Sequence, residues 1–122
     1  MTGILILAHG SRKTETEETL NQVCAMLKEM LPEMLIETAY MEFSEKTIEQ
    51  GLDELVSQGA EEIKVIPYFL FSGIHIQQDI PEEIDAYLKK NPNIKISFGK
   101  TLGADRRLAE ILKDRIEESV SK

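Results

Sequence analysis

The sequence predicts an α/β protein built on a single open, mostly parallel four-stranded sheet with helices on both faces. Short apolar runs alternate with segments in which apolar residues recur every three or four positions, the spacing of an amphipathic helix. This alternation favours parallel strands joined by right-handed crossovers. The 122 residues suffice for one compact domain. No linker or low-complexity run divides residues 1–122, so we expect a single domain.

Composition narrows the class of protein. Hydrophobic residues make up 42% of the chain and charged residues 30%, as in soluble globular domains. Cys24 is the only cysteine, which excludes an internal disulfide, and its spacing from Leu20 and Leu27 predicts that it is buried. The net charge of −8 argues against a nucleic-acid partner. The opening residues resemble neither a signal peptide nor a membrane span, so we expect a cytoplasmic protein without a membrane partner.

The first strand and the first helix are predicted from a change in the spacing of apolar residues along the chain. Residues 4–8 are uniformly apolar, which predicts a central strand covered on both faces. The next segment has apolar residues at helical spacing, and Pro32 is expected to end that helix. These apolar residues are Leu20, Val23, Cys24, Leu27, Met30 and Leu31.

The second strand and helix repeat the arrangement. Residues 35–40 are predicted to form a short strand. Ser44 is a candidate N-cap for the following helix, and Gly59 stands where a helix commonly ends. The buried face of this helix is expected to carry Ile48, Leu52 and Leu55.

The remaining elements surround the segment PYFLFSGIHIQQDIP at residues 67–81. A third strand over 63–66 precedes it, and Asp79-Ile80-Pro81-Glu82 predicts a capping box that opens a third helix. Apolar and polar side chains alternate over residues 94–98, which predicts an edge strand. A last helix is expected to start near Asp105. The inward residues are predicted to be Ile84, Tyr87 and Leu88 in the third helix, and Leu108, Ile111, Leu112 and Ile116 in the last.

Three side chains with metal-binding or acid–base chemistry follow the first three predicted strands. They are His9, Glu42 and His75. Because parallel strands end at one edge of the sheet, we expect these side chains to gather there. Neutral imidazole binds metals and also accepts protons near neutral pH. Two imidazoles and a carboxylate suit divalent Fe, Co, Ni or Zn, in a site that keeps open coordination positions.

Each of these residues also has a structural interpretation. A loop histidine can be a surface or hydrogen-bonded residue, and Glu42 can be solvated or lie near a helix amino end. Asp79 fits a helix cap better than a catalytic group. Gly10 and Ser11 can present backbone N–H groups to an anion at a helix start. The basic residues near the same edge, Arg12, Lys13, Arg106 and Arg107, indicate either an acidic small-molecule ligand or solvated helix faces.

Three segments carry a family resemblance that spans essentially the whole chain. The stretch AHGSR after the first strand, the Glu42 segment, and PYFLFSGIHIQQDIP resemble the short CbiX-type sirohydrochlorin chelatases of the class II chelatase superfamily. The resemblance implies a chelatase-like half-domain and ATP-independent insertion of a divalent metal into sirohydrochlorin, a tetrapyrrole with eight carboxylates. The metal is a substrate, with Co²⁺ favoured over Ni²⁺ or Fe²⁺. No organic cofactor is implied, and the product can serve cobalamin, siroheme or nickel-tetrapyrrole synthesis.

The resemblance also implies roles for residues and a partner. His9 and His75 stand at the positions of the family's metal-site histidines, and Glu42 matches a glutamate of larger relatives. We expect His75 to be the principal ligand and base, with His9 beside it. Longer relatives hold two such units facing across a cleft, so a homodimer is expected here. Substrate contacts are predicted for Gly10, Ser11, Arg12, Phe71, Ser72, Gly73 and Ile74, whereas Phe69 and Leu70 can equally belong to the core.

Two other functions fit part of the pattern. A phosphohistidine carrier of the sugar-transport type uses a histidine after the first strand, which explains His9 but gives His75 no role. A non-catalytic metal-binding module explains both histidines without a reaction. The sequence HGSR lacks the glycine pattern of nucleotide-binding loops, so nucleotide binding is weakly supported.

Overall fold

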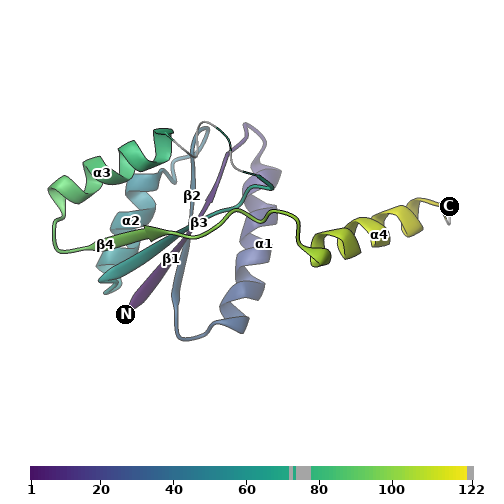
Figure 1. The fold of residues 1–122 in the computed structure, drawn as a ribbon, viewed down its shortest axis with the longest axis horizontal. Coiled ribbons are helices and arrows are strands. Elements are labelled where there is room, and N and C mark those ends of the chain that lie inside the picture. Colours follow the sequence, from purple (N-terminus) through teal and green to yellow (C-terminus); the bar gives the residue numbers. More distant parts are fainter. Residues whose placement is uncertain (72, 74–77, 121–122) are drawn as a thin grey trace.

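The sheet has the predicted architecture. A computed structural model describes residues 1–71, 73 and 78–120. Within them, four parallel strands lie in the order β2-β1-β3-β4, with β1 central and β4 at an edge (Figure 1). The strands are β1 (Thr2–Ala8), β2 (Leu35–Tyr40), β3 (Glu62–Pro67) and β4 (Lys95–Phe98). The expected parallel α/β fold is therefore confirmed.

Helices cover both faces of the sheet, as predicted. The described helices are α1 (Thr14–Met30), α2 (Ile48–Ser57), α3 (Ile80–Lys90) and α4 (Arg106–Val120). α2 and α3 pack on one face, and α1 packs on the other (Figure 1). None of the helices in these residue ranges is long and apolar enough to span a bilayer.

The strand β1 supplies apolar side chains to both faces, which explains its uninterrupted apolar run. Leu5 and Leu7 are completely buried against α2 and α3. Ile4 and Ile6 point to the opposite face, where α1 contributes Cys24 to the second core cluster. The predicted burial of Cys24 is confirmed, and this burial raises the pKa of its thiol. The outer part of the predicted apolar face of α1 stays exposed, including Val23, Met30 and Leu31.

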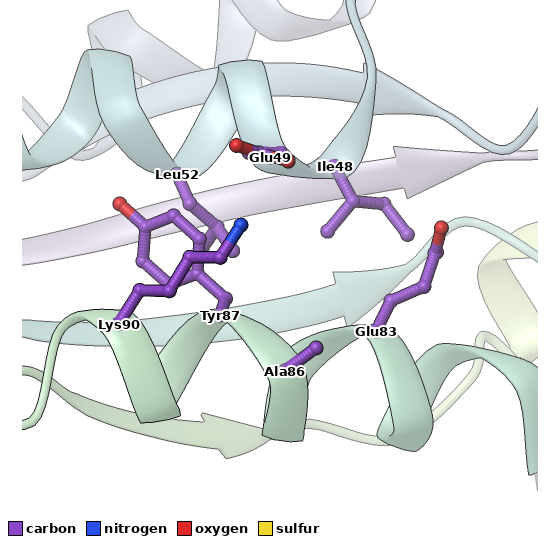
Figure 2. Close-up of a pocket in the computed structure, with 7 residues that line it drawn as sticks. All are labelled: Ile48, Glu49, Leu52, Glu83, Ala86, Tyr87 and Lys90. Carbon is purple, nitrogen blue, oxygen red and sulfur yellow. The ribbon is translucent and has the colours of Figure 1, made fainter.

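Helices α2 and α3 lie side by side, and side chains of both line the space between them (Figure 2). Leu52 of α2 is fully buried and Tyr87 of α3 nearly so. The Tyr87 hydroxyl donates a hydrogen bond of 2.7 Å to Asp53 Oδ1. A cavity of about 140 Å³ between the two helices contains neither His9 nor Glu42 among its lining residues. These contacts hold the two helices together on one face of the sheet.

The starts of α2 and α3 differ from the predicted caps. Thr47, not Ser44, caps α2, because Thr47 Oγ1 accepts from the Gln50 N–H at 3.2 Å. Ser44 Oγ instead accepts from Lys46 N–H within a local turn. The prediction of a capping box at the start of α3 was also wrong. Asp79 already has helical dihedrals and its side chain makes no capping hydrogen bond, since helical winding begins before it. Gly59, with φ of 105°, ends α2 as expected.

The predicted buried face of α4 was wrong. None of its described residues is buried, and Ile111, Leu112 and Ile116 are 49%, 63% and 61% exposed. The helix extends away from the sheet (Figure 1). Two backbone hydrogen bonds of 2.8 Å, from Leu102 N to Phe69 O and from Gly103 N to Leu70 O, attach the preceding linker to the segment after β3. This linker therefore directs α4 away from its own sheet.

Candidate active site

The carboxyl ends of β1 and β2 bring together two of the three predicted metal-site residues. His9 Nε2 lies 2.8 Å from Glu42 Oε1. Both side chains are about half exposed, at 55% and 48%. Residues far apart in the sequence thus meet at the edge where parallel strands end, as the topology predicted. His75 lies outside the described residues.

The backbone holds this pair in place. Met41 N donates to Ala8 O at 3.0 Å and Glu42 N donates to His9 O at 3.1 Å, which extends the β1–β2 pairing beyond the strands. Gly10 has φ of 102°, a conformation that favours glycine. A Cβ atom at position 10 would lie 2.0 Å from the Glu42 carbonyl oxygen. Gly10 therefore allows the two loops to approach closely enough for the His9–Glu42 contact.

The contact determines which ring nitrogen of His9 is available. A carboxylate only accepts hydrogen bonds, so Nε2 carries the hydrogen and donates to Glu42. In the neutral ring, Nδ1 then keeps its lone pair and can bind a divalent ion or accept a proton. Carboxylate–histidine pairs of this kind orient metal-binding imidazoles in many proteins. Across the described part of the chain, no group of three His, Cys, Asp or Glu side chains is arranged to hold a metal.

An acidic hollow adjoins the pair. It has a volume of about 660 Å³ and is lined by His9, Met41, Glu42, Asp79, Glu82, Glu83 and Ala86. Partial removal of water and the neighbouring Asp79 both raise the pKa of Glu83. Four carboxyl groups around one hollow favour cations and disfavour anions. This side of the rim therefore suits an approaching metal ion better than a carboxylate-bearing ligand.

The predicted anion-binding residues, Gly10, Ser11 and Arg12, follow His9 in the loop before α1 and are not among the residues that line this hollow. Helix α1 starts at Thr14, so Gly10 and Ser11 precede the helix and their expected position at its start was wrong. Ser11 Oγ accepts from Lys13 N–H at 3.2 Å. The Arg12 guanidinium lies over the ring of Phe43, 4.9 Å from its centroid, within the range of a cation–π contact. No sequence pattern marked Phe43 as part of the site.

The other predicted substrate residues are placed only in part. Phe71 is 77% exposed, and among the described residues no atom lies within 4 Å of a Cβ placed at Gly73. Ser72 and Ile74 lie outside the described residues.

The basic pair after β4 has local partners. Arg107 holds Asp105 through two side-chain hydrogen bonds of 2.7 and 2.8 Å, which lowers the pKa of Asp105. Arg106 Nε lies 3.8 Å from Glu110. These contacts favour the interpretation of Arg106 and Arg107 as solvated helix residues.

A parallel α/β fold with a histidine–carboxylate pair at the carboxyl edge of its sheet defines a protein with an exposed site suited to metal or proton chemistry. The sequence model of the CbiX family matches residues 3–119. The chain therefore belongs to the CbiX family.

Curated relatives fall into two length classes. A sirohydrochlorin cobaltochelatase of Sulfurisphaera tokodaii is 33% identical over 118 residues, covering 97% of this chain and 93% of that protein. A cobaltochelatase of Sulfolobus acidocaldarius is 34% identical, with 99% and 94% covered. A sirohydrochlorin ferrochelatase of Priestia megaterium is 33% identical over 98% of this chain, which spans only 45% of the length of that relative.

Solved structures show the same two classes. The putative cobalamin biosynthesis CbiX protein of Marinobacter aquaeolei is 27% identical with a TM-score of 0.79, and 99% of this chain and 98% of that chain are covered. SirB of Bacillus subtilis with Fe³⁺ is 32% identical with a TM-score of 0.85. There the coverage is 96% of this chain and 46% of that one.

Proposed function

We propose that this chain is a sirohydrochlorin metallochelatase that inserts a divalent metal into the tetrapyrrole without ATP. The observation that carries the proposal is the His9–Glu42 pair at the carboxyl edge of the sheet, beside an acidic hollow. The names of the relatives support the substrate class. Two relatives of matching length are cobaltochelatases, so Co²⁺ is the favoured metal, followed by Fe²⁺ and Ni²⁺.

The reaction releases two pyrrole protons as the metal exchanges its water and protein ligands for four ring nitrogens. His9 is suited to hold the ion or accept one proton through Nδ1, because Glu42 fixes Nε2. Glu42 then stabilises the imidazolium that forms. We assign the second imidazole, as principal ligand and base, to His75. Glu42 thus acts through His9 in this proposal, and its expected role as a direct ligand through the other carboxylate oxygen stays a prediction.

The hollow and the Arg12–Phe43 contact suggest separate sites of approach for the two substrates. The carboxylates that line the hollow attract the metal ion, whereas Arg12 is suited to a peripheral carboxylate of the macrocycle. The exposed Phe71 ring can contact the apolar face of the tetrapyrrole. The same carboxylates repel a phosphoryl group, which disfavours a phosphohistidine carrier at His9.

The test mixes the protein with sirohydrochlorin and Co²⁺ and follows the absorbance change on metallation. We expect acceleration over the uncatalysed rate and a loss of about 10- to 100-fold in Glu42→Gln, the usual effect of removing an orienting carboxylate. Glu29→Gln, an exposed carboxylate on α1, is the matched control. His75→Ala should lose most of the activity. A wild-type protein that leaves the metallation rate unchanged rules out the chelatase.

We further propose that the chain works as a homodimer, with the cleft between subunits. The exposed apolar stripe of α4 supports this. Three ion pairs run along the helix: Arg106–Glu110, Lys113–Glu117 and Arg115–Glu118. The four basic and four acidic residues of α4 balance within a chain of net charge −8, so α4 can approach a second copy with little repulsion.

A further inference from the structure

The backbone of Phe43 is an outlier beside the His9–Glu42 pair. Phe43 has φ of 59°, and within residues 1–71, 73 and 78–120 no other non-glycine residue has a positive φ. A bulky side chain disfavours this left-handed conformation, which persists only where the surrounding structure enforces it. Here Tyr40 N donates to Lys46 O at 2.8 Å and Glu42 N donates to His9 O at 3.1 Å. These bonds close the loop on both sides of Phe43.

The unusual backbone presents the aromatic ring at the rim instead of burying it. The Phe43 side chain is 49% exposed, and the Arg12 guanidinium lies over its ring. Arg12 forms no ion pair with any of the described residues. A guanidinium stacked on a ring keeps the N–H donors at its edge available for a carboxylate. The contact also connects the loop after β1 to the loop after β2.

We infer that Phe43 is a positioning residue that holds Arg12 ready for a carboxylate of the substrate. This inference rests on the proposed function, because sirohydrochlorin supplies the carboxylates. Stacking restricts a long flexible side chain before binding, so less conformational entropy is lost when the ion pair forms. The strained backbone of Phe43 is the structural cost of placing an aromatic ring at this point of the rim.

The experiment compares two substitutions that separate the ring from the strain. Phe43→Leu removes the ring and keeps a side chain on the left-handed backbone, whereas Phe43→Gly removes both. Sirohydrochlorin is titrated without metal to obtain its Kd, and thermal unfolding is measured on the same samples. We expect both variants to weaken binding about threefold, the scale of an exposed cation–π contact. Phe43→Gly should unfold at a higher temperature than Phe43→Leu.

A double-mutant cycle shows whether Phe43 acts through Arg12. Arg12→Ala should weaken binding about tenfold, as expected for one charge-assisted hydrogen bond. Adding Phe43→Leu to Arg12→Ala should then change the Kd no further. Unchanged binding in Phe43→Leu, or additive losses in the double variant, overturns the inference.

The inference and the proposed function fail in different ways. Wild-type protein that binds sirohydrochlorin without accelerating metallation contradicts the chelatase, while the cycle still decides the role of Phe43. A wild-type protein that binds no sirohydrochlorin overturns both. If Phe43→Leu is unfolded by circular dichroism, Phe43→Asn replaces it, because asparagine tolerates the left-handed conformation.

Discussion

Helices α2 and α4 have the same kind of apolar pattern and different environments. In α2, Ile48, Leu52 and Leu55 are buried against the sheet. In α4, Leu112 and Ile116 repeat at the same spacing and remain mostly exposed. The spacing of apolar residues thus predicts that one face of a helix is buried. It does not predict which surface covers that face. For α2 the covering surface is in the same chain. For α4 we propose that it is in a second copy.

The largest difference between the helices should appear on truncating a leucine in each. Leu52→Ala is expected to reduce the free energy of unfolding by about 2–5 kcal/mol, because it leaves a cavity at a fully buried position. Leu112→Ala should change it by less than about 0.5 kcal/mol in the monomer. Urea unfolding at a protein concentration too low for dimers measures both values. Equal losses at the two positions would show that α4 packs on its own chain.

A glycine in α2 sharpens the comparison. A Cβ at Gly51 would lie 2.6 Å from Leu5 Cδ1, so Gly51→Ala should destabilise the protein by about 1–3 kcal/mol through overpacking. Alanine is nevertheless the better helix former by about 1 kcal/mol. As a control, Ser119→Ala in α4 should be neutral or slightly stabilising. A stabilised Gly51→Ala would mean that α2 does not pack this closely on β1.

The polar contact between α2 and α3 gives a pH-dependent prediction. Tyr87→Phe removes the hydrogen bond to Asp53 and should cost about 0.5–1.5 kcal/mol at pH 7. Burial, then Asp53, raises the pKa of Tyr87 in the folded protein. The unfolded tyrosine ionises near pH 10, so the stability that Tyr87 contributes is present below about pH 10 and declines above it. Unfolding in guanidinium chloride at pH 7 and at pH 10.5 measures the free energy of unfolding of the wild type and of Tyr87→Phe. The difference between the two values should be smaller at pH 10.5. A difference in the free energy of unfolding that is larger at pH 10.5 than at pH 7 contradicts this prediction.

A substitution on the exposed apolar stripe of α4 should have the smallest effect on the free energy of unfolding. It should have a large effect on dimer formation. Ile116→Lys should leave the monomer fold intact, because the side chain is 61% exposed, and should convert dimers to monomers. Asp114→Asn makes the same change in charge on the opposite face of the helix and should remain dimeric. Size-exclusion chromatography with light scattering measures the mass. If Ile116→Lys remains dimeric, α4 is not part of the dimer interface, although the protein is still a dimer. If the wild type is monomeric, both the dimer and the role of α4 in it are disproved.

The sequence by itself determined the order of the elements, the parallel sheet and the edge at which the site lies. These features depend on local periodicity and on the rule that parallel strands end together, and both can be read from short segments. The meeting of His9 and Glu42 followed from the same rule. The exact cap residues did not, because Thr47 and Ser44 have similar intrinsic preferences and the loop backbone selects between them.

Only the tertiary structure decided which groups touch. Glu42 binds His9 Nε2 because Gly10 allows the two loops to meet, a contact that depends on backbone positions and not on residue type alone. The stacking of Arg12 on Phe43 requires a left-handed aromatic residue, which local preference disfavours. The exposed stripe of α4 arises from the path of the linker after β4. Long-range geometry therefore assigned partners to side chains whose chemistry was already evident in the sequence.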